Sequence, residues 1–363
     1  MKGPRQPITL LVSINFESST GGVSRVAHLM HDAIDTSEVL SLYGNTELSS
    51  EHIKYFAQNR VSFLSALLWH VLYHRPSVII FDHVGPASLL ALIPKFLLKK
   101  VIVFLHDEEA WKPVSARHKK GLDKATHILC NSQYTYQKFI ANNPIYKSQT
   151  QVCLLAGIPI SFENNVLKPS SDIYQKWFTD TIPYVIFVSR LWKEHRYKGH
   201  LELIEAFKIL KDQNINLPMR LAIVGHGDDS EYIQQQLFSL KLENNISLFT
   251  NVSDDDLSKF YSHSCGLVFP STREGFGFVF LEAMYFGKPC IGVIDQPAEE
   301  IIVPNVSGIL MKDNSPQSIV EVLKDIVENP QKYTSMGLEG KKIYESKFTN
   351  SHFKQRFLNC IAK

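Results

Sequence analysis

The 363-residue sequence lacks several features that would assign it to a specialised class of protein. No apolar run approaches the roughly 18–20 residues that a membrane-spanning helix needs. The short apolar stretch at residues 8–14 is not followed by a signal-peptide cleavage pattern. Tracts of low complexity are absent, and hydrophobic and charged residues make up 44% and 20% of the chain. This composition is typical of a folded protein and argues against a disordered or fibrous one.

Cysteine is scarce and poorly placed for cross-linking. The cysteines are odd in number, widely scattered and without a CxxC pair: Cys130, Cys153, Cys265, Cys290 and Cys360. This distribution argues against a disulfide framework and against a zinc site. We therefore expect a protein of a reducing compartment and place it in the cytoplasm.

The pattern of strands and helices runs through the chain twice. An apolar run at residues 8–14, the pair Gly21-Gly22 and a helical pattern up to residue 34 open the first series. The second series begins at residue 184, after a polar stretch with weak periodicity. Two such series predict an α/β protein with two Rossmann-like, doubly wound domains that face a central cleft. We predict the first domain at residues 1–165, a linker at 166–182 and the second domain at 183–345.

The segment Glu274-Gly-Phe-Gly-Phe-Val-Phe-Leu-Glu282 is the most informative motif. It follows a buried strand-like run and opens a helix that we expect to begin near Phe278. The free amides and the positive dipole end of that helix favour an anion, and Gly275 and Gly277 allow close approach of a ligand. Glu274 and Glu282 can accept hydrogen bonds from paired hydroxyls of a sugar or ribose. Both could instead be solvated surface residues.

This motif resembles that of the retaining glycosyltransferases of family 4 (group 1 glycosyltransferases), which have the two-domain GT-B fold. Their hallmark of two glutamates separated by seven residues stands here as Glu274 and Glu282, followed by Ala-Met-x-x-Gly-Lys-Pro. The resemblance implies that Glu274 binds hydroxyls of the donor sugar and Glu282 the nucleotide ribose. It also implies a C-terminal helix, at about 346–363, that crosses back to the first domain. The donor-binding residues expected from it are Gly21, Gly22, Gly225, Glu274, Gly275, Phe276, Gly277, Phe278, Val279 and Glu282.

A basic loop after the first strand of the second domain suits a diphosphate. Arg190 offers a planar fork of donors and Lys198 a mobile point charge. The family has Arg and Lys at matching positions, and often a histidine where His106 follows a strand of the first domain. By resemblance the catalytic set is Arg190, Lys198, Glu274 and His106. Taken alone, the loop could be a solvated turn and His106 a structural residue.

The Asp-x-Asp pattern at Asp254-Asp-Asp256 lies at a predicted helix N-terminus. Acidic side chains are favourable there without any metal, because they cap the first turn and interact with the helix dipole. We expect no metal site there and no metal cofactor.

We therefore expect a retaining glycosyltransferase that moves a hexose-type sugar from a UDP- or GDP-sugar to a glycan or lipid-linked acceptor. Such an enzyme would serve in the synthesis of a cell-surface polysaccharide or glycolipid. The alternatives are another GT-B enzyme, such as a phosphorylase or an inverting transferase, and a non-catalytic nucleotide-sugar-binding subunit. A nicotinamide-dependent dehydrogenase is disfavoured because no Gly-x-Gly-x-x-Gly follows the first strand.

Residues 95–124 carry eight basic and four acidic side chains. The basic ones are Lys95, Lys99, Lys100, Lys112, Arg117, Lys119, Lys120 and Lys124. They could bind an anionic membrane surface, which would place the protein on the inner face of a membrane, or they could be a solvated face. We expect no nucleic-acid partner.

Overall fold

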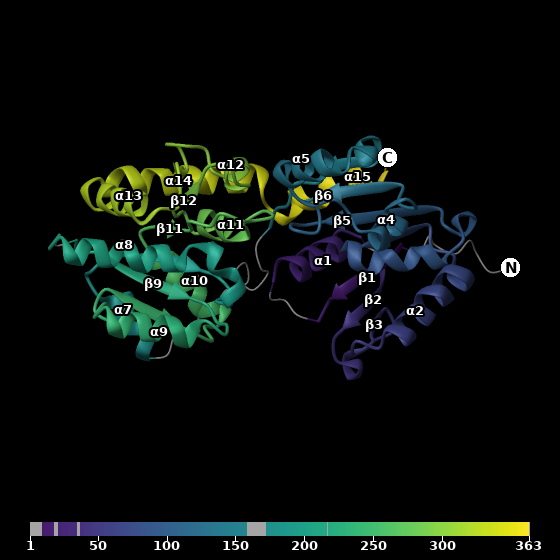
Figure 1. Cartoon of the computed structure of the whole chain (residues 1–363), viewed down its shortest axis with the longest axis horizontal. Coiled ribbons are helices and arrows are strands. Elements are labelled where there is room, and N and C mark those ends of the chain that lie inside the picture. Colours follow the sequence, from purple (N-terminus) through teal and green to yellow (C-terminus); the bar gives the residue numbers. More distant parts are fainter. Residues whose placement is uncertain (1–8, 18–20, 35–36, 158–171, 216, 363) are drawn as a thin grey trace. The chain divides into compact units, whose positions relative to one another are not determined.

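The computed structural model describes residues 9–17, 21–34, 37–157, 172–215 and 217–362. Contacts divide the chain into two compact units, Met1–Gly157 with Asn350–Lys363, and Ile158–Thr349 (Figure 1). Each unit contains its own parallel sheet with helices packed on it.

The sheet of the first unit has the strand order β3-β2-β1-β4-β5-β6-β7, with neighbouring strands parallel. Its strands are β1 (Thr9–Asn15), β2 (Ser37–Tyr43), β3 (Ile53–Tyr55), β4 (Val78–Phe81), β5 (Lys100–Leu105), β6 (His127–Cys130) and β7 (Thr150–Val152). The helices are α1 (Gly22–Ala33), α2 (Arg60–Trp69), α3 (Val84–Ala87), α4 (Ala116–Leu122), α5 (Gln133–Asn142) and α15 (Asn350–Ala362). The central strands are mostly apolar and buried, as expected for a parallel sheet covered by helices on both faces.

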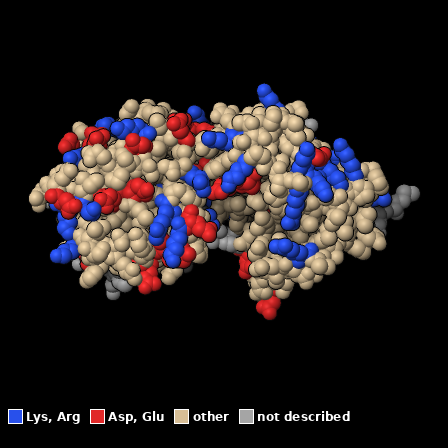
Figure 2. Space-filling view, viewed as in Figure 1, with Lys and Arg blue, Asp and Glu red and all other residues tan. Residues whose placement is uncertain are grey.

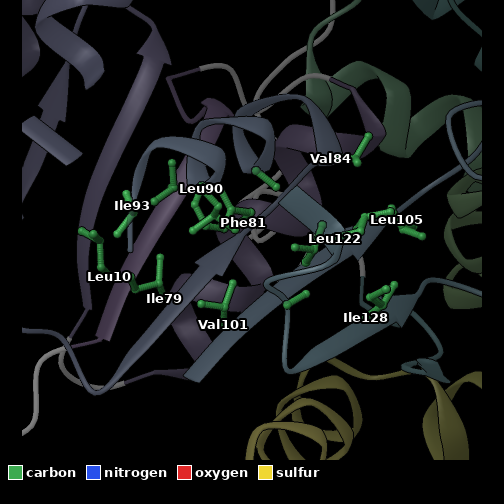
Figure 3. Packing of buried hydrophobic residues seen from close by; sticks show 14 of the residues in the cluster. Leu10, Ile79, Phe81, Val84, Leu90, Ile93, Val101, Leu105, Leu122 and Ile128 are labelled. Carbon is green, nitrogen blue, oxygen red and sulfur yellow. The ribbon is translucent and has the colours of Figure 1, made fainter. Parts of the chain in front are cut away.

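The core of this unit follows from the strand register. Leu10 pairs with Ile79, and Ile79 pairs with Val101, so the three side chains lie side by side on one face of β1, β4 and β5. Leu90 and Leu122 join the same buried cluster from outside the sheet (Figure 3). This packing fixes the carboxyl ends of the strands, where the polar residues described below begin.

The sheet of the second unit has the order β10-β9-β8-β11-β12-β13, also parallel. Its strands are β8 (Tyr184–Val188), β9 (Arg220–Val224), β10 (Ile246–Phe249), β11 (Leu267–Val268), β12 (Cys290–Val293) and β13 (Gly308–Met311). The helices are α7 (Asp172–Thr179), α8 (His200–Asp212), α9 (Ser230–Ser239), α10 (Asp254–His263), α11 (Phe278–Tyr285), α12 (Ala298–Ile301), α13 (Pro316–Glu328) and α14 (Pro330–Lys347). The chain first adds β9 and β10 on one side of β8, and then returns to add β11, β12 and β13 on the other side. Such a reversal beside a central strand is characteristic of a doubly wound fold.

The predicted linker at 166–182 differs from the structure, and its first part, up to residue 171, lies outside the described residues. Residues 172–179 form the helix α7, which packs on α10. The reason is aromatic packing, because Tyr174 and Phe178 lie with ring centroids 5.5 and 5.0 Å from that of Phe260. The C-terminal helix α15 begins at Asn350, packs on α1 and belongs to the first unit.

Across the described parts of the chain, no helix combines the length and apolar character needed to cross a bilayer.

Candidate functional site

Gly277 shapes the turn between β11 and α11. Gly277 precedes α11 with φ 95° and ψ 60°, a left-handed conformation, and a Cβ atom there would lie 2.8 Å from the ring of Phe280. The helix begins at Phe278, as predicted, and its N-cap residue, Gly277, supplies no side-chain cap. Phe280 N donates to Gly277 O at 3.1 Å, and the positive dipole end of the helix at Phe278 favours an anionic ligand. The same turn contains Gly275 and Phe276, and the second residue of α11 is Val279.

Two of the predicted site residues meet in a close ion pair. Lys198 Nζ lies 2.6 Å from Glu274 Oε1, and the side chains are 13% and 15% exposed. Ser271 Oγ donates to the same carboxylate oxygen at 3.0 Å. Lys198 also lies 5.5 Å from the centroid of Phe269, close enough for a cation–π contact. The predicted phosphate-binding cation and the predicted sugar-binding carboxylate are thus neighbours.

Glu282, the second glutamate of the motif, is buried. Only 7% of the residue is exposed, and its Oε2 accepts a hydrogen bond from Tyr261 Oη at 2.8 Å. Tyr261 belongs to α10 and stacks on Phe286 with ring centroids 5.7 Å apart. The structure therefore excludes the solvated-helix alternative for Glu282, and one carboxylate oxygen already has an internal partner.

The 190–199 loop, which carries Arg190 and Lys198, is packed against the 270–274 turn. Thr272 N donates to Tyr197 O at 3.0 Å. Gly199 has φ 92°, and a Cβ atom there would lie 2.5 Å from Pro270 Cγ. Arg190 is exposed. The loop is thus an ordered part of the second unit rather than a solvated turn.

The two glycines of the Gly225-His-Gly227 segment allow its backbone to pack closely against the backbone of residues 189–191. A Cβ atom on Gly225 would overlap Ser189 O, and one on Gly227 would overlap Leu191 O. Leu191 N donates to His226 O at 2.8 Å. This segment therefore supports the base of the 190–199 loop, and the predicted contact of Gly225 with the donor stays a prediction.

Three residues that the sequence did not single out form a buried polar cluster beside this loop. Asp229 is completely buried, and it accepts hydrogen bonds from Arg196 Nε at 2.8 Å, Arg196 Nη2 at 2.6 Å and His200 Nε2 at 3.2 Å. The guanidinium of Arg196 holds the pKa of Asp229 below its usual value. The sequence does show an acid shortly after the strand β9, and a basic loop elsewhere in the same domain. However, residues 196 and 229 are too far apart in the chain for their spacing to predict a contact between them. We call Arg196, Asp229 and His200 the Asp229 clamp.

In the first unit, His106 lies at the end of β5 and is 4% exposed. Its Nε2 donates to Asp82 O at 2.5 Å, and burial lowers its pKa. Asp82 is fully buried, and burial raises its pKa to about 7 although Ser13 Oγ donates to it at 2.5 Å. His83 stacks on His106 with centroids 6.2 Å apart, and burial lowers the pKa of His83 to about 4. The predicted catalytic histidine therefore belongs to a buried, hydrogen-bonded cluster.

The remaining predicted positions are simple to place. Gly21 has φ 104°, and Gly22 begins α1. Asp254, Asp255 and Asp256 form the first turn of α10, where Ser253 caps the helix and Asp256 lies 3.6 Å from Lys259. The acidic triplet thus stabilises a helix N-terminus, as its position suggested.

Residues 172–343 match the family model described as "Glycosyl transferases group 1". The second unit is a group 1 glycosyltransferase domain. The motif from Glu274 to Glu282, the 190–199 loop and the Asp229 clamp all lie within this glycosyltransferase domain.

Two of the similar proteins are named for capsular polysaccharide and for O-antigen chains. The capsular polysaccharide biosynthesis glycosyltransferase CapM of Staphylococcus aureus is 28% identical over 234 residues, which cover 62% of this chain and 58% of CapM. The O-antigen chain mannosyltransferase C of Escherichia coli is 24% identical over 232 residues, 61% of this chain and 60% of that protein. The matches therefore span about three fifths of the length of these relatives.

The fold of the whole chain has solved counterparts. The Anabaena protein Alr3699/HepE, in a crystal structure with UDP-glucose, superposes with a TM-score of 0.77 over 98% of this chain and 99% of that one, at 19% identity. The glycosyltransferase domain and its partner unit thus form the GT-B fold predicted from the sequence.

Proposed function

We propose that the protein is a retaining glycosyltransferase of family 4 that transfers a hexose-type sugar from a UDP- or GDP-sugar to a glycan or lipid-linked acceptor. The ion pair between Lys198 and Glu274 carries this proposal, because it brings a phosphate-binding cation and a hydroxyl-binding carboxylate together beside the turn that opens α11, whose dipole favours an anion. The relationship to CapM and to the O-antigen mannosyltransferase supports a role in cell-surface polysaccharide or glycolipid synthesis. The UDP-glucose bound by HepE supports a nucleotide-sugar donor.

In the proposed reaction, the bond between the sugar C1 and the donor phosphate oxygen breaks, and a bond from C1 to an acceptor oxygen forms on the same face. The electron pair of the broken bond stays on the nucleoside diphosphate, whose charge Lys198, Arg190 and the α11 amides stabilise. The acceptor proton passes to the leaving phosphate. Glu274 orients the sugar hydroxyls, and His106, with its Nε2 committed to Asp82 O, contacts the sugar as a neutral group.

The first experiment is a thermal-shift and NMR screen with UDP- and GDP-sugars, because a bound donor stabilises the fold by mass action. The second is a comparison of Lys198→Ala with Lys332→Ala. Lys332 makes an ion pair of the same length, 2.6 Å to Asp325, in the same unit but on α14. We expect Lys198→Ala to lower kcat by roughly 10²–10³ and Lys332→Ala to leave it unchanged.

Each alternative has its own signature in these experiments. Equal kcat values for the two lysine variants would remove Lys198 from the reaction. Product anomericity by NMR separates retention from inversion, and dependence on inorganic phosphate would indicate a phosphorylase. Donor binding without hydrolysis or transfer would indicate a non-catalytic subunit. We further propose that transfer requires no metal ion, so activity should survive EDTA.

We also propose that the first unit binds an anionic membrane surface, through a smaller set of lysines than the sequence suggested. Lys124 donates to the carbonyls of Leu90, Ala91 and Ile93, and Lys100 to that of Ile361. Arg117 donates to Ser88 and Lys112 pairs with Glu108. Among the described residues, no side-chain partner is found for the exposed Lys95, Lys99, Lys119 and Lys120. Figure 2 shows basic side chains gathered over α4 with few acidic ones near them.

An exposed aromatic side chain accompanies these lysines. Phe96 is 86% exposed between Lys95 and Lys99, and Leu92, in a segment that packs on α4, is 61% exposed. An apolar side chain flanked by cations suits the interface of an anionic bilayer. We expect Phe96→Ser to weaken retention by anionic vesicles, whereas Phe238→Ser, which alters a 74% exposed phenylalanine of the other unit, should not. Equal retention of all variants by neutral and anionic vesicles would contradict this part of the proposal.

A further inference from the structure

We propose that the Asp229 clamp positions Lys198, so that Arg196 and Asp229 act on the donor phosphates through that lysine rather than by touching them. This inference rests on the proposed function of Lys198.

The clamp secures the chain on both sides of Lys198. Arg196 lies two residues before the lysine and His200 two residues after it, and both bind the one carboxylate of Asp229. The backbone at 197 and 199 is fixed from the other direction by Thr272 and Pro270. Residues 196 and 200 therefore contact Asp229, whereas residues 197 and 199 contact Thr272 and Pro270. Lys198 lies between them and bonds Glu274.

Asp229 is itself tied to the loop that it supports. Its backbone N donates to Leu191 O at 2.9 Å, and the neighbouring Asp228 Oδ1 accepts from Lys193 N at 2.8 Å. With no exposure to solvent, the Asp229 carboxylate has no water to replace a lost partner. A buried carboxylate in a bidentate pair with arginine has one strongly preferred geometry. The buried carboxylate of Asp229 therefore fixes the position of the 190–199 loop.

Arg196 is committed to this structural task. Two of its nitrogens bond Asp229, and its guanidinium lies 4.3 Å from the ring centroid of Tyr232. Among the basic residues of the loop, Arg196 is thus a positioning arginine, and Arg190 and Lys198 are the two proposed to bind the donor phosphates. A displacement of about 1 Å at a reacting group can cost 10²-fold in rate, so the support of Lys198 has a measurable consequence.

The test variant is Arg196→Gln, with Arg220→Gln as its matched control. Arg220 also pairs with an aspartate, 3.1 Å to Asp180, and lies 4.1 Å from the ring centroid of Trp177, but it stands at the start of β9 rather than beyond its end. We expect Arg196→Gln to weaken UDP binding by about tenfold in calorimetry and to leave uridine binding unchanged. Arg196→Lys, which keeps the charge but not the fork, should give an intermediate loss. Arg220→Gln should alter neither.

A double-mutant cycle separates positioning from a general structural effect. In a Lys198→Ala background, Arg196→Gln should have almost no further effect on UDP binding, because its effect is transmitted by the missing lysine. A full additional tenfold loss in that background, or an equal loss of uridine binding, would overturn the inference. If the chain takes GDP, the same cycle is run with GDP and guanosine.

A donor-free measurement distinguishes failure of this inference from failure of the proposed function. Asp229→Asn should increase amide hydrogen exchange at residues 191–199 and leave β8 protected. If the wild type binds no nucleotide yet this change appears, the proposed function fails and the clamp stands. Unchanged exchange at 191–199 would refute the clamp whatever the ligand.

Discussion

The buried carboxyl of Asp82 should make the stability of the first unit depend on pH in an unusual direction. Asp82 is completely buried, and burial raises its pKa from 3.8 to about 7. The folded chain therefore keeps this proton up to about pH 7, whereas the unfolded chain releases it near pH 3.8. A carboxyl of this kind contributes stability at low pH that is lost as the pH rises through this window.

The magnitude follows from the two pKa values. Each pH unit between them lowers the free energy of unfolding by about 1.4 kcal/mol, which amounts to about 2.5 kcal/mol between pH 5 and pH 8. In Asp82→Asn this dependence should vanish, while Ser13 Oγ and Ile14 N, which both donate to Oδ2 of Asp82, can still donate to a carbonyl oxygen at that position. His83 and His106 act in the opposite direction, because their lowered pKa values make stability fall as the pH falls. Both histidines are present in both proteins and cancel in the difference.

The assay is urea unfolding of the full chain at pH 5, 6, 7 and 8, read by pulsed hydrogen exchange at β1 and β4. The strands report the first unit alone, so unfolding of the second unit does not enter. The wild type should lose stability relative to Asp82→Asn as the pH rises. Parallel pH curves for the two proteins would show that Asp82 is already ionised at pH 5 and would refute the reasoning.

Three further predictions concern other contacts. Tyr261→Phe removes the donor to the buried Glu282 and should lower the free energy of unfolding by about 1.5–3 kcal/mol, measured by urea denaturation; no loss would mean that solvent already satisfies this carboxylate. Gly227→Ala would push its Cβ into Leu191 O, so we expect a lower Tm and weaker UDP binding, and an unchanged Tm would contradict the close backbone packing. Lys124→Met removes the donor to three carbonyls and should cost about 1–3 kcal/mol, a loss that calorimetry can detect and that Lys119→Met should not reproduce.

The sequence was sufficient for the features that depend on local pattern. The two series of strands and helices predicted two parallel sheets, and the segment between the strand-like run and the helix predicted that α11 begins near Phe278. These succeed because burial on both faces and a left-handed backbone leave direct signatures in the residues concerned.

Features that depend on distant partners were beyond the sequence. Arg196 and Asp229 are brought together only when β9 lies beside β8, and Glu282 receives its hydrogen bond from Tyr261 of another helix, α10. The helix α7 was taken for a linker because its aromatic residues find their partners on another helix. In each case the interaction is absent until the tertiary fold exists.

The ion pair between Lys198 and Glu274 also bears on which ligands the proposed site rejects. Each group already compensates the other's charge, with little exposure to solvent. A free phosphate could draw Lys198 away only by leaving a largely buried carboxylate without its cation, which costs several kcal/mol. A nucleotide sugar brings phosphates for the lysine and hydroxyls for the carboxylate in one molecule. Glu274, which competes with any anion for Lys198, would then discriminate against the abundant small anions of a cell.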